Sequence, residues 1–229
     1  ILSNVLLSGE DNGLCLTATD LDLSIVENTA ADIITLGATT TPAHLLYDIV
    51  RKLPDGAQIE MSMDSSKGQL SLKSGRSNFS LPCLPREDYP VIATQELSHS
   101  FKISASDLRH LVDKTRFAMS SEETRYYLNG IYIHATELSG KPTLRAVATD
   151  GHRLALLDSP LPEGAERVPS VIVPRKAIGE LRRLLEHTEK DVDVNLSDSQ
   201  IRFTVASTVL TTKLIDGTFP DYQRVIPEE

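Results

Sequence analysis

An internal repeat constrains the fold of this 229-residue chain more than any other feature of its sequence. Residues 16–20 (LTATD) are echoed 130 positions later by residues 146–150 (AVATD). Two more landmarks recur in the same order, namely a proline before a helix-like stretch (Pro42 and Pro174) and the pair Asp-Tyr (residues 88–89 and 221–222). The offset stays between 130 and 133 residues, so the chain is predicted to contain two copies of one unit.

Both copies predict the same order of elements. Alternating apolar and polar residues predict strands within residues 14–25 and 144–157. Pro42 and Pro174 suit the first turn of a helix, where a missing N–H costs nothing, so helices are expected at 42–53 and 173–186. Further strands are expected at 59–63, 69–74, 78–82, 192–196, 200–205 and 209–214. The predicted fold class is α+β, duplicated.

The two copies differ at their starts. About 50 residues, from Ser98 on, precede the second Ala-Thr-Asp, whereas 17 precede the first. The extra residues predict a helix over 106–117, capped by Ser104 or Ser106, with four residues on one buried face: Leu108, Leu111, Val112 and Thr115. We therefore expect domains at 1–97 and 98–229, the first of them truncated and lacking its opening helix.

The net charge of −9, taken alone, argues against binding to nucleic acid, but the charges are unevenly distributed along the chain. In all three predicted helices the lysines and arginines outnumber the acids. In the helix 173–186 a buried stripe of Ile178, Leu181 and Leu185 should leave the cations facing outward: Arg175, Lys176, Arg182 and Arg183. Outward cations suit sequence-independent contact with phosphates, although they also solvate any amphipathic helix.

Other classes of protein find little support in the sequence. No apolar run approaches the roughly 20 residues of a bilayer span, and no signal peptide is recognisable, so a cytoplasmic protein is expected. Cys15 and Cys83 lie far apart, and the histidines lack metal-ligand spacing, so no metal site is expected. No P-loop, nucleophile elbow or dinucleotide motif occurs, so neither a cofactor nor catalysis is expected.

Four motifs in one order give the chain a specific resemblance. They are RYYLNG (125–130), ATDGHRLA (148–155), VPRK (173–176) and FPDY (219–222). With these motifs the chain closely resembles, over its whole length, the bacterial beta sliding clamp family, the processivity factor of the replicative DNA polymerase. The resemblance implies the DNA clamp fold, in which three similar domains carry antiparallel sheets outside and helices inside. Two subunits would join head to tail around duplex DNA, and a third domain is expected to be absent from this chain.

The resemblance also implies two sites. One is a pocket for a short linear motif of partner proteins, at Leu128, Thr149, Gly151, His152, Arg153, Leu154, Pro220, Arg224 and Val225. Its four large apolar residues (Leu128, Leu154, Pro220, Val225) could line a socket, with His152, Arg153 and Arg224 as a polar rim. The other is a DNA-contacting set, at Arg125, Tyr126, Tyr127, Arg175 and Lys176.

The implied partners are double-stranded DNA, the replicative polymerase catalytic subunit, the clamp loader, repair and translesion polymerases, and a second copy of the full-length chain in a head-to-tail homodimer. No membrane partner is expected. Two other hypotheses stay open on the residues alone, a hydrolase that uses Asp150 and His152 and a stand-alone DNA-binding module. For the first, a turn aspartate and a structural histidine explain the pair better, because residues two apart on a strand share a face without necessarily touching.

Overall fold

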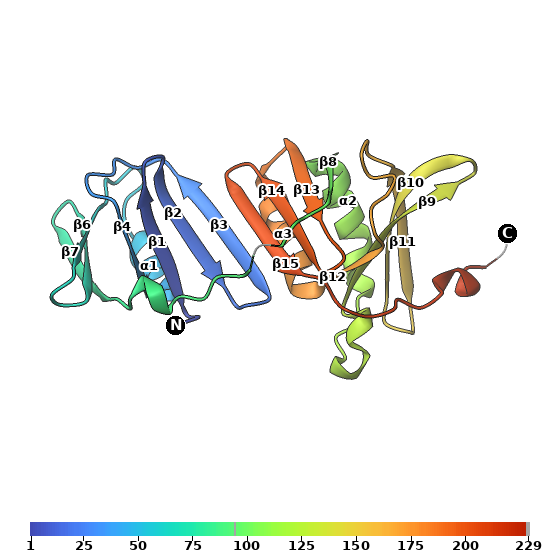
Figure 1. The fold of residues 1–229 in the computed structure, drawn as a ribbon, viewed down its shortest axis with the longest axis horizontal. Coiled ribbons are helices and arrows are strands. Elements are labelled where there is room, and N and C mark those ends of the chain that lie inside the picture. The colour runs from blue at the N-terminus through green and yellow to red at the C-terminus, as the bar shows by residue number, and fades with distance from the viewer. Residues whose placement is uncertain (94, 228–229) are drawn as a thin grey trace. The chain divides into compact units, whose positions relative to one another are not determined.

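The computed structural model describes residues 1–93 and 95–227, which form two compact units (Figure 1). The first unit is Ile1–Ala93 and the second holds the described residues from 95 on. Each unit combines antiparallel sheets with helices, so the predicted α+β class is confirmed.

The first unit contains two antiparallel sheets and one helix. Its first sheet has the order β4-β1-β2-β3, with β1 (Asn4–Glu10), β2 (Gly13–Thr19), β3 (Leu23–Thr29) and β4 (Gly37–Pro42). Its second sheet has the order β5-β6-β7, with β5 (Glu60–Asp64), β6 (Gln69–Ser74) and β7 (Ser77–Pro82). The helix α1 (Ala43–Val50) follows β4 directly. Six buried side chains form the core between these elements: Val5, Leu7, Leu46, Leu70, Leu72 and Leu81.

The second unit repeats this plan with more elements. One sheet has the order β11-β10-β9-β12, with β9 (Gly130–Leu138), β10 (Lys141–Thr149), β11 (Leu154–Pro160) and β12 (Val171–Pro174). The other contains β8 (His99–Ser104), β13 (Asp191–Leu196), β14 (Gln200–Val205) and β15 (Thr208–Lys213) in the order β15-β14-β13-β8. The helix α2 (Ala105–Thr115) packs against β10 and β11 and beside α3 (Arg175–Leu184) (Figure 1).

The predicted helices exist, but their ends differ from the prediction. Pro42 and Pro174 each close a strand and stand at the N-cap, so α1 and α3 begin one residue after the proline. The α-helical part of α3 ends at Leu184 because residues 185–187 tighten into a 3-10 turn. In α2 the N-cap is Ser104, whose Oγ accepts a hydrogen bond from the N–H of Asp107 at 3.0 Å.

The second Ala-Thr-Asp sequence forms the turn between β10 and β11. Asp150 Oδ1 accepts hydrogen bonds from the N–H groups of His152 and Arg153, both at 3.0 Å. Thr149 Oγ1 donates to the carbonyl of Arg153 at 2.7 Å and accepts from the N–H of Gly151 at 3.1 Å. The side chains of this motif therefore satisfy the main chain of a turn in which Gly151 has a φ of +86°.

The first Ala-Thr-Asp sequence builds the same turn between β2 and β3. Asp20 Oδ1 accepts from the N–H groups of Asp22 and Leu23 at 3.0 and 2.7 Å. Thr19 Oγ1 donates to the carbonyl of Leu23 at 2.8 Å and accepts from the N–H of Leu21 at 3.1 Å. Leu21 takes the place of the glycine, with a φ of +79°. The sequence echo thus reflects one turn formed twice.

The contact between β9 and β12 depends on a glycine. Gly130 pairs with Pro174, and a Cβ at position 130 would collide with the carbonyl of Val173. Gly130→Ala should therefore lower the free energy of unfolding of the second unit by about 1–3 kcal/mol. Gly179→Ala in the interior of α3, where a Cβ meets nothing within 4 Å, should raise it by about 0.5–1 kcal/mol. Urea denaturation of both variants measures the difference, and equal stabilities would contradict the close approach.

Candidate functional site

Residues from both predicted sites pack in or against one apolar cluster in the second unit. Its buried members are Leu128, Val147, Ile172, Phe219 and Tyr222, which we call the Tyr222 cluster. Partly buried side chains pack against it: Tyr127, Tyr132, Leu154, Leu156 and Ile215. Leu128 and Leu154 of the predicted pocket and Tyr127 of the predicted DNA set thus share one packing centre.

The predicted DNA loop folds as η3 (Glu123–Leu128), a 3-10 segment before β9. Tyr126 is exposed, and its ring meets the edge of Tyr127 with centroids 5.8 Å apart. Arg125 donates two hydrogen bonds to Glu122, from Nε at 2.9 Å and from Nη2 at 2.6 Å. The hydrogen bonds from Arg125 lower the pKa of Glu122, so this carboxylate holds the arginine beside the tyrosines.

The helix α3 presents fewer outward cations than its sequence predicts. Arg175 is exposed, yet its Nε and Nη2 donate to the carbonyl of Ser120 at 3.1 and 2.9 Å, and Nη2 also donates to Met119 O. Arg182 Nε donates to Asp113 of α2 at 2.6 Å, and its side chain is only 22% exposed. The expectation of outward cations is therefore wrong for Arg182, because that charge ties α3 to α2. Lys176 is exposed.

The turn at residues 149–153 gives no support to acid-base catalysis. The N–H of His152 and then that of Arg153 lower the pKa of Asp150 to about 2, so its carboxylate is ionised at neutral pH. Its other oxygen accepts from Arg153 Nε at 2.9 Å, and the Arg153 guanidinium lies over the ring of Phe117, 5.7 Å from the centroid. Asp150 contacts the main chain of His152, which is the arrangement of a turn aspartate.

A polar hollow of about 330 Å³ lies beside this turn. It brings His152 and Arg153 of the predicted pocket close to Arg175 of the predicted DNA set. Its full lining is Arg116, Phe117, Met119, Ser120, Ser121, Glu122, Asp150, His152, Arg153 and Arg175. Three guanidinium groups and two carboxylates therefore face one space.

The C-terminal part of the predicted pocket lies on the segment around η5 (Tyr222–Val225). Arg224 pairs with Asp221 at 2.8 Å and is 83% exposed, while Pro220 is exposed and Val225 is 68% exposed. The four apolar residues of the predicted socket are thus divided. Leu128 belongs to the Tyr222 cluster and Leu154 packs against it, whereas Pro220 and Val225 stand on the surface of a segment anchored by Phe219 and Tyr222.

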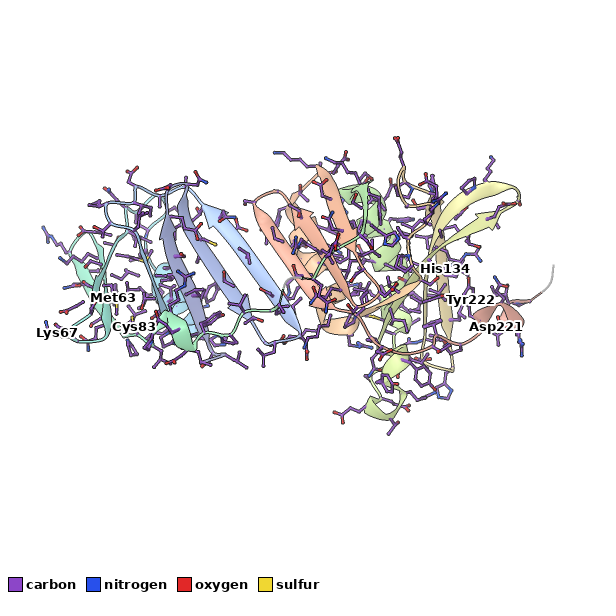
Figure 2. The ribbon with its side chains drawn as sticks, viewed as in Figure 1. Met63, Lys67, Cys83, His134, Asp221 and Tyr222 are labelled. Carbon is purple, nitrogen blue, oxygen red and sulfur yellow. The ribbon has the colours of Figure 1, made fainter. Side chains whose placement is uncertain are left out.

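A buried polar network, which the sequence did not reveal, holds this segment (Figure 2). His134 on β9 and Tyr222 form a hydrogen bond of 2.9 Å between Nε2 and the phenol oxygen. Arg145 on β10 lies opposite His134 and reaches the same phenol at 3.4 Å. The available signal was a histidine and an arginine each flanked by two apolar residues, but their partner Tyr222 is 88 and 77 residues away.

Comparison with known proteins identifies the family of this chain. Residues 102–221 match the model of the DNA polymerase III beta subunit, central domain, and residues 1–93 match its N-terminal domain. The chain belongs to the DNA polymerase III beta subunit family. Both copies of the repeat are thus accounted for by successive domains of one family.

The relatives and solved structures agree with this assignment. The Beta sliding clamp of Caulobacter vibrioides is 52% identical over 229 residues, which cover 100% of this chain and 62% of the relative. The structure of Caulobacter crescentus pol III beta superposes with a TM-score of 0.96 at 52% identity, covering 100% of this chain and 62% of that one. A DnaN sliding clamp from Bartonella birtlesii bound to griselimycin has a TM-score of 0.94 at 53% identity, covering 99% and 60%. The expected DNA clamp fold is confirmed.

The chain spans 62% of the length of the Caulobacter relative of this clamp family. Among the described residues, no helix has both the length and the apolar character needed to cross a membrane. Within residues 1–93 and 95–227 no group of three or more histidine, cysteine, aspartate or glutamate side chains could hold a metal ion.

The turn glycine of the clamp-family motif ATDGHR is expected to be needed twice over. Any other residue at position 151 would be strained by the backbone φ of +86°. Its Cβ would also lie 2.6 Å from Arg125 Nη1. Gly151→Ala should destabilise the second unit by about 1–3 kcal/mol and displace the Arg125 guanidinium. Gly140→Ala is the matched control, because Gly140 has a φ of +78° with nothing within 4 Å of its Cβ.

Thermal unfolding should show similar losses in both variants, whereas the NMR signal of Arg125 Nε–H should move only in Gly151→Ala. An equal displacement in the control would exclude a direct contact between position 151 and the arginine.

Proposed function

We propose that this chain forms part of a non-catalytic sliding clamp that encircles duplex DNA, confers processivity on the replicative polymerase and docks partner proteins. The main support is the match of its two units to successive domains of the DNA polymerase III beta subunit family. The ring itself would be a head-to-tail homodimer of the full-length protein, in the cytoplasm.

The proposed contact with DNA uses the loop η3 and the start of α3. Tyr126 is exposed and can stack or donate its hydroxyl, and Lys176 is exposed at the first turn of the helix. Arg125 and Arg175 add positive charge beside Tyr126 and Lys176, although both guanidinium groups also form hydrogen bonds within the unit. Such cations attract phosphates without reading bases, which suits a protein that moves along DNA.

The proposed partner pocket lies along the rim of the Tyr222 cluster. Leu154 is half-buried against the cluster, and the buried Leu128 would form the floor of the pocket. The adjoining turn consists of Thr149, Gly151, His152 and Arg153. Pro220, Arg224 and Val225 would form the facing edge. Each large apolar anchor of a bound peptide would contribute about 1.5–3 kcal/mol, which suits exchangeable partners such as polymerases and the clamp loader.

A peptide-binding experiment tests the pocket. The chain is extended with the remaining part of the Caulobacter vibrioides relative and titrated with a fluorescent peptide from the C-terminal tail of the replicative polymerase catalytic subunit. Leu154→Asp should weaken binding by about tenfold or more, because a carboxylate replaces an apolar wall. Leu138→Asp, at the exposed end of β9, is the matched control and should bind normally. Equal affinities for the two variants would refute the pocket assignment.

A second experiment separates a clamp from a stand-alone DNA-binding module. The same extended protein is loaded onto a nicked circular plasmid by the Caulobacter clamp loader, and the plasmid is then cut once. A clamp should stay on the circle in moderate salt and leave after cutting, because an encircling ring slides off open ends. Tight, salt-sensitive binding to short linear duplexes, with retention after cutting, would favour the module.

A further inference from the structure

The hydroxyl of Tyr222 lies in a buried polar network with the side chains of His134, Arg145 and Asp158. Tyr222, His134 and Arg145 are 6%, 9% and 8% exposed. Asp158 on β11 accepts two hydrogen bonds from Arg145, at 2.7 Å from Nε and 2.8 Å from Nη2. This bidentate pair fixes the arginine, which can then present Nη1 to the Tyr222 oxygen.

The partners determine the direction of each hydrogen bond. The carbonyl of Ala135 lies 3.1 Å from His134 Nδ1 and can only accept, so Nδ1 carries the proton. Arg145 can only donate, so the Tyr222 oxygen accepts from it and its own O–H points to His134 Nε2. The chain of donors is complete only when His134 is neutral.

This network sits at the root of the exposed segment that carries the proposed pocket edge. Phe219 stacks on Tyr132 of β9 with centroids 4.7 Å apart and an angle of 5° between the rings. Tyr222 is the second anchor and opens η5. Val225 ends the 3-10 turn that Tyr222 opens, so the position of Tyr222 affects where Val225 projects.

The first unit shows that the histidine is not required to bury a tyrosine at this place. Tyr89 is the repeat counterpart of Tyr222 and is 5% exposed. Its hydroxyl lies 3.0 Å from the carbonyl of Thr17 and 3.3 Å from that of Asn4, so main-chain groups hold it. The second unit instead uses a side chain that can change its charge.

We propose that the chain Arg145–Tyr222–His134 holds segment 219–225 against β9 and β10, and that His134 is thereby a positioning residue for the partner pocket. The inference rests on the proposed docking function for its effect on partners. The holding of the segment itself does not depend on that function.

Protonation of His134 should release the segment. Burial lowers the pKa of His134, and the positive charge of Arg145 acts in the same direction, while the hydrogen bond to the Ala135 carbonyl and the Asp158 carboxylate oppose them. The other titratable groups that face the ring are the phenols of Tyr132 and Tyr222. A depressed histidine pKa means that the closed segment is fully favoured above the ordinary value of about 6.5 and loses stability as the pH falls below it.

Hydrogen exchange of the 229-residue chain tests the network without any partner. Tyr222→Phe keeps the ring and removes only the hydroxyl, so exchange in peptides covering residues 219–226 should rise by about fivefold at about pH 8. His134→Phe should do the same, whereas His134→Gln should recover part of the protection, because an amide oxygen can accept from the phenol. Exchange in β13 and β14 should not change, which controls for global unfolding.

The pH profile separates positioning from simple packing. After correction for intrinsic exchange, the wild-type segment should keep its protection from about pH 8 to about pH 6.5 and lose it as the pH falls further to about 5.5, whereas His134→Gln should not lose it. Protection that is independent of pH in the wild type, or unaffected by Tyr222→Phe, would overturn the proposal.

The effect on docking is measured with the extended protein and the fluorescent peptide described above. Tyr222→Phe should weaken peptide binding by about threefold to tenfold, with the wild type showing the same decline below about pH 6.5. Binding that is equal in wild type and Tyr222→Phe, with increased exchange in the variant, would overturn the positioning role and leave the docking function intact. If the wild type binds no peptide at all, the docking function fails, while the exchange data still decide whether the network holds the segment.

Discussion

Burial of the Tyr222 cluster is the constraint on which the rest of the second unit depends. Its members come from the loop after α2, from β10, from β12 and from the segment after β15, so no one stretch of chain can complete it. Apolar burial of this kind is non-directional, and the stacked rings of Phe219 and Tyr132 supply the orientation. Leu128 and Leu154 of the proposed partner pocket and Tyr127 of the proposed DNA loop meet at this one centre, so the two proposed surfaces share a packing core.

The positive charge of the helices has two roles. Arg182 pairs with Asp113, and Arg109 donates to the carbonyl of Leu185, so these two guanidinium groups join α2 to α3 and the turn after it. Their planar, multiple donors suit such internal bridges better than an ammonium would. The charge available for the proposed contact with phosphates is therefore smaller than the amino-acid count suggests.

The sequence was a good guide where the information is local. The strands at 69–74 and 200–205 occur as predicted because alternation and turn residues define them within a few positions. Helix starts were misplaced because the prolines cap the helices from the preceding strands. The split of the socket residues and the pairing of His134 with Tyr222 depend on segments far apart in the chain, and no local pattern encodes such contacts. The family motifs supplied the residues of the proposed site, but the hydrogen bonds around them required coordinates.

The two copies of the Thr-Asp turn differ at the residue with positive φ, leucine in the first and glycine in the second. Without a side chain at Gly151 there is room for Arg125 to reach across from another loop, at a place where even a methyl group would be too close. Duplicated domains are usually said to diversify by adding loops and side chains. Here the copy with the smaller residue gains the extra contact, because the space beside Gly151 admits the side chain of Arg125. The loss of a side chain in one copy of a repeat can therefore create room for a residue from another loop.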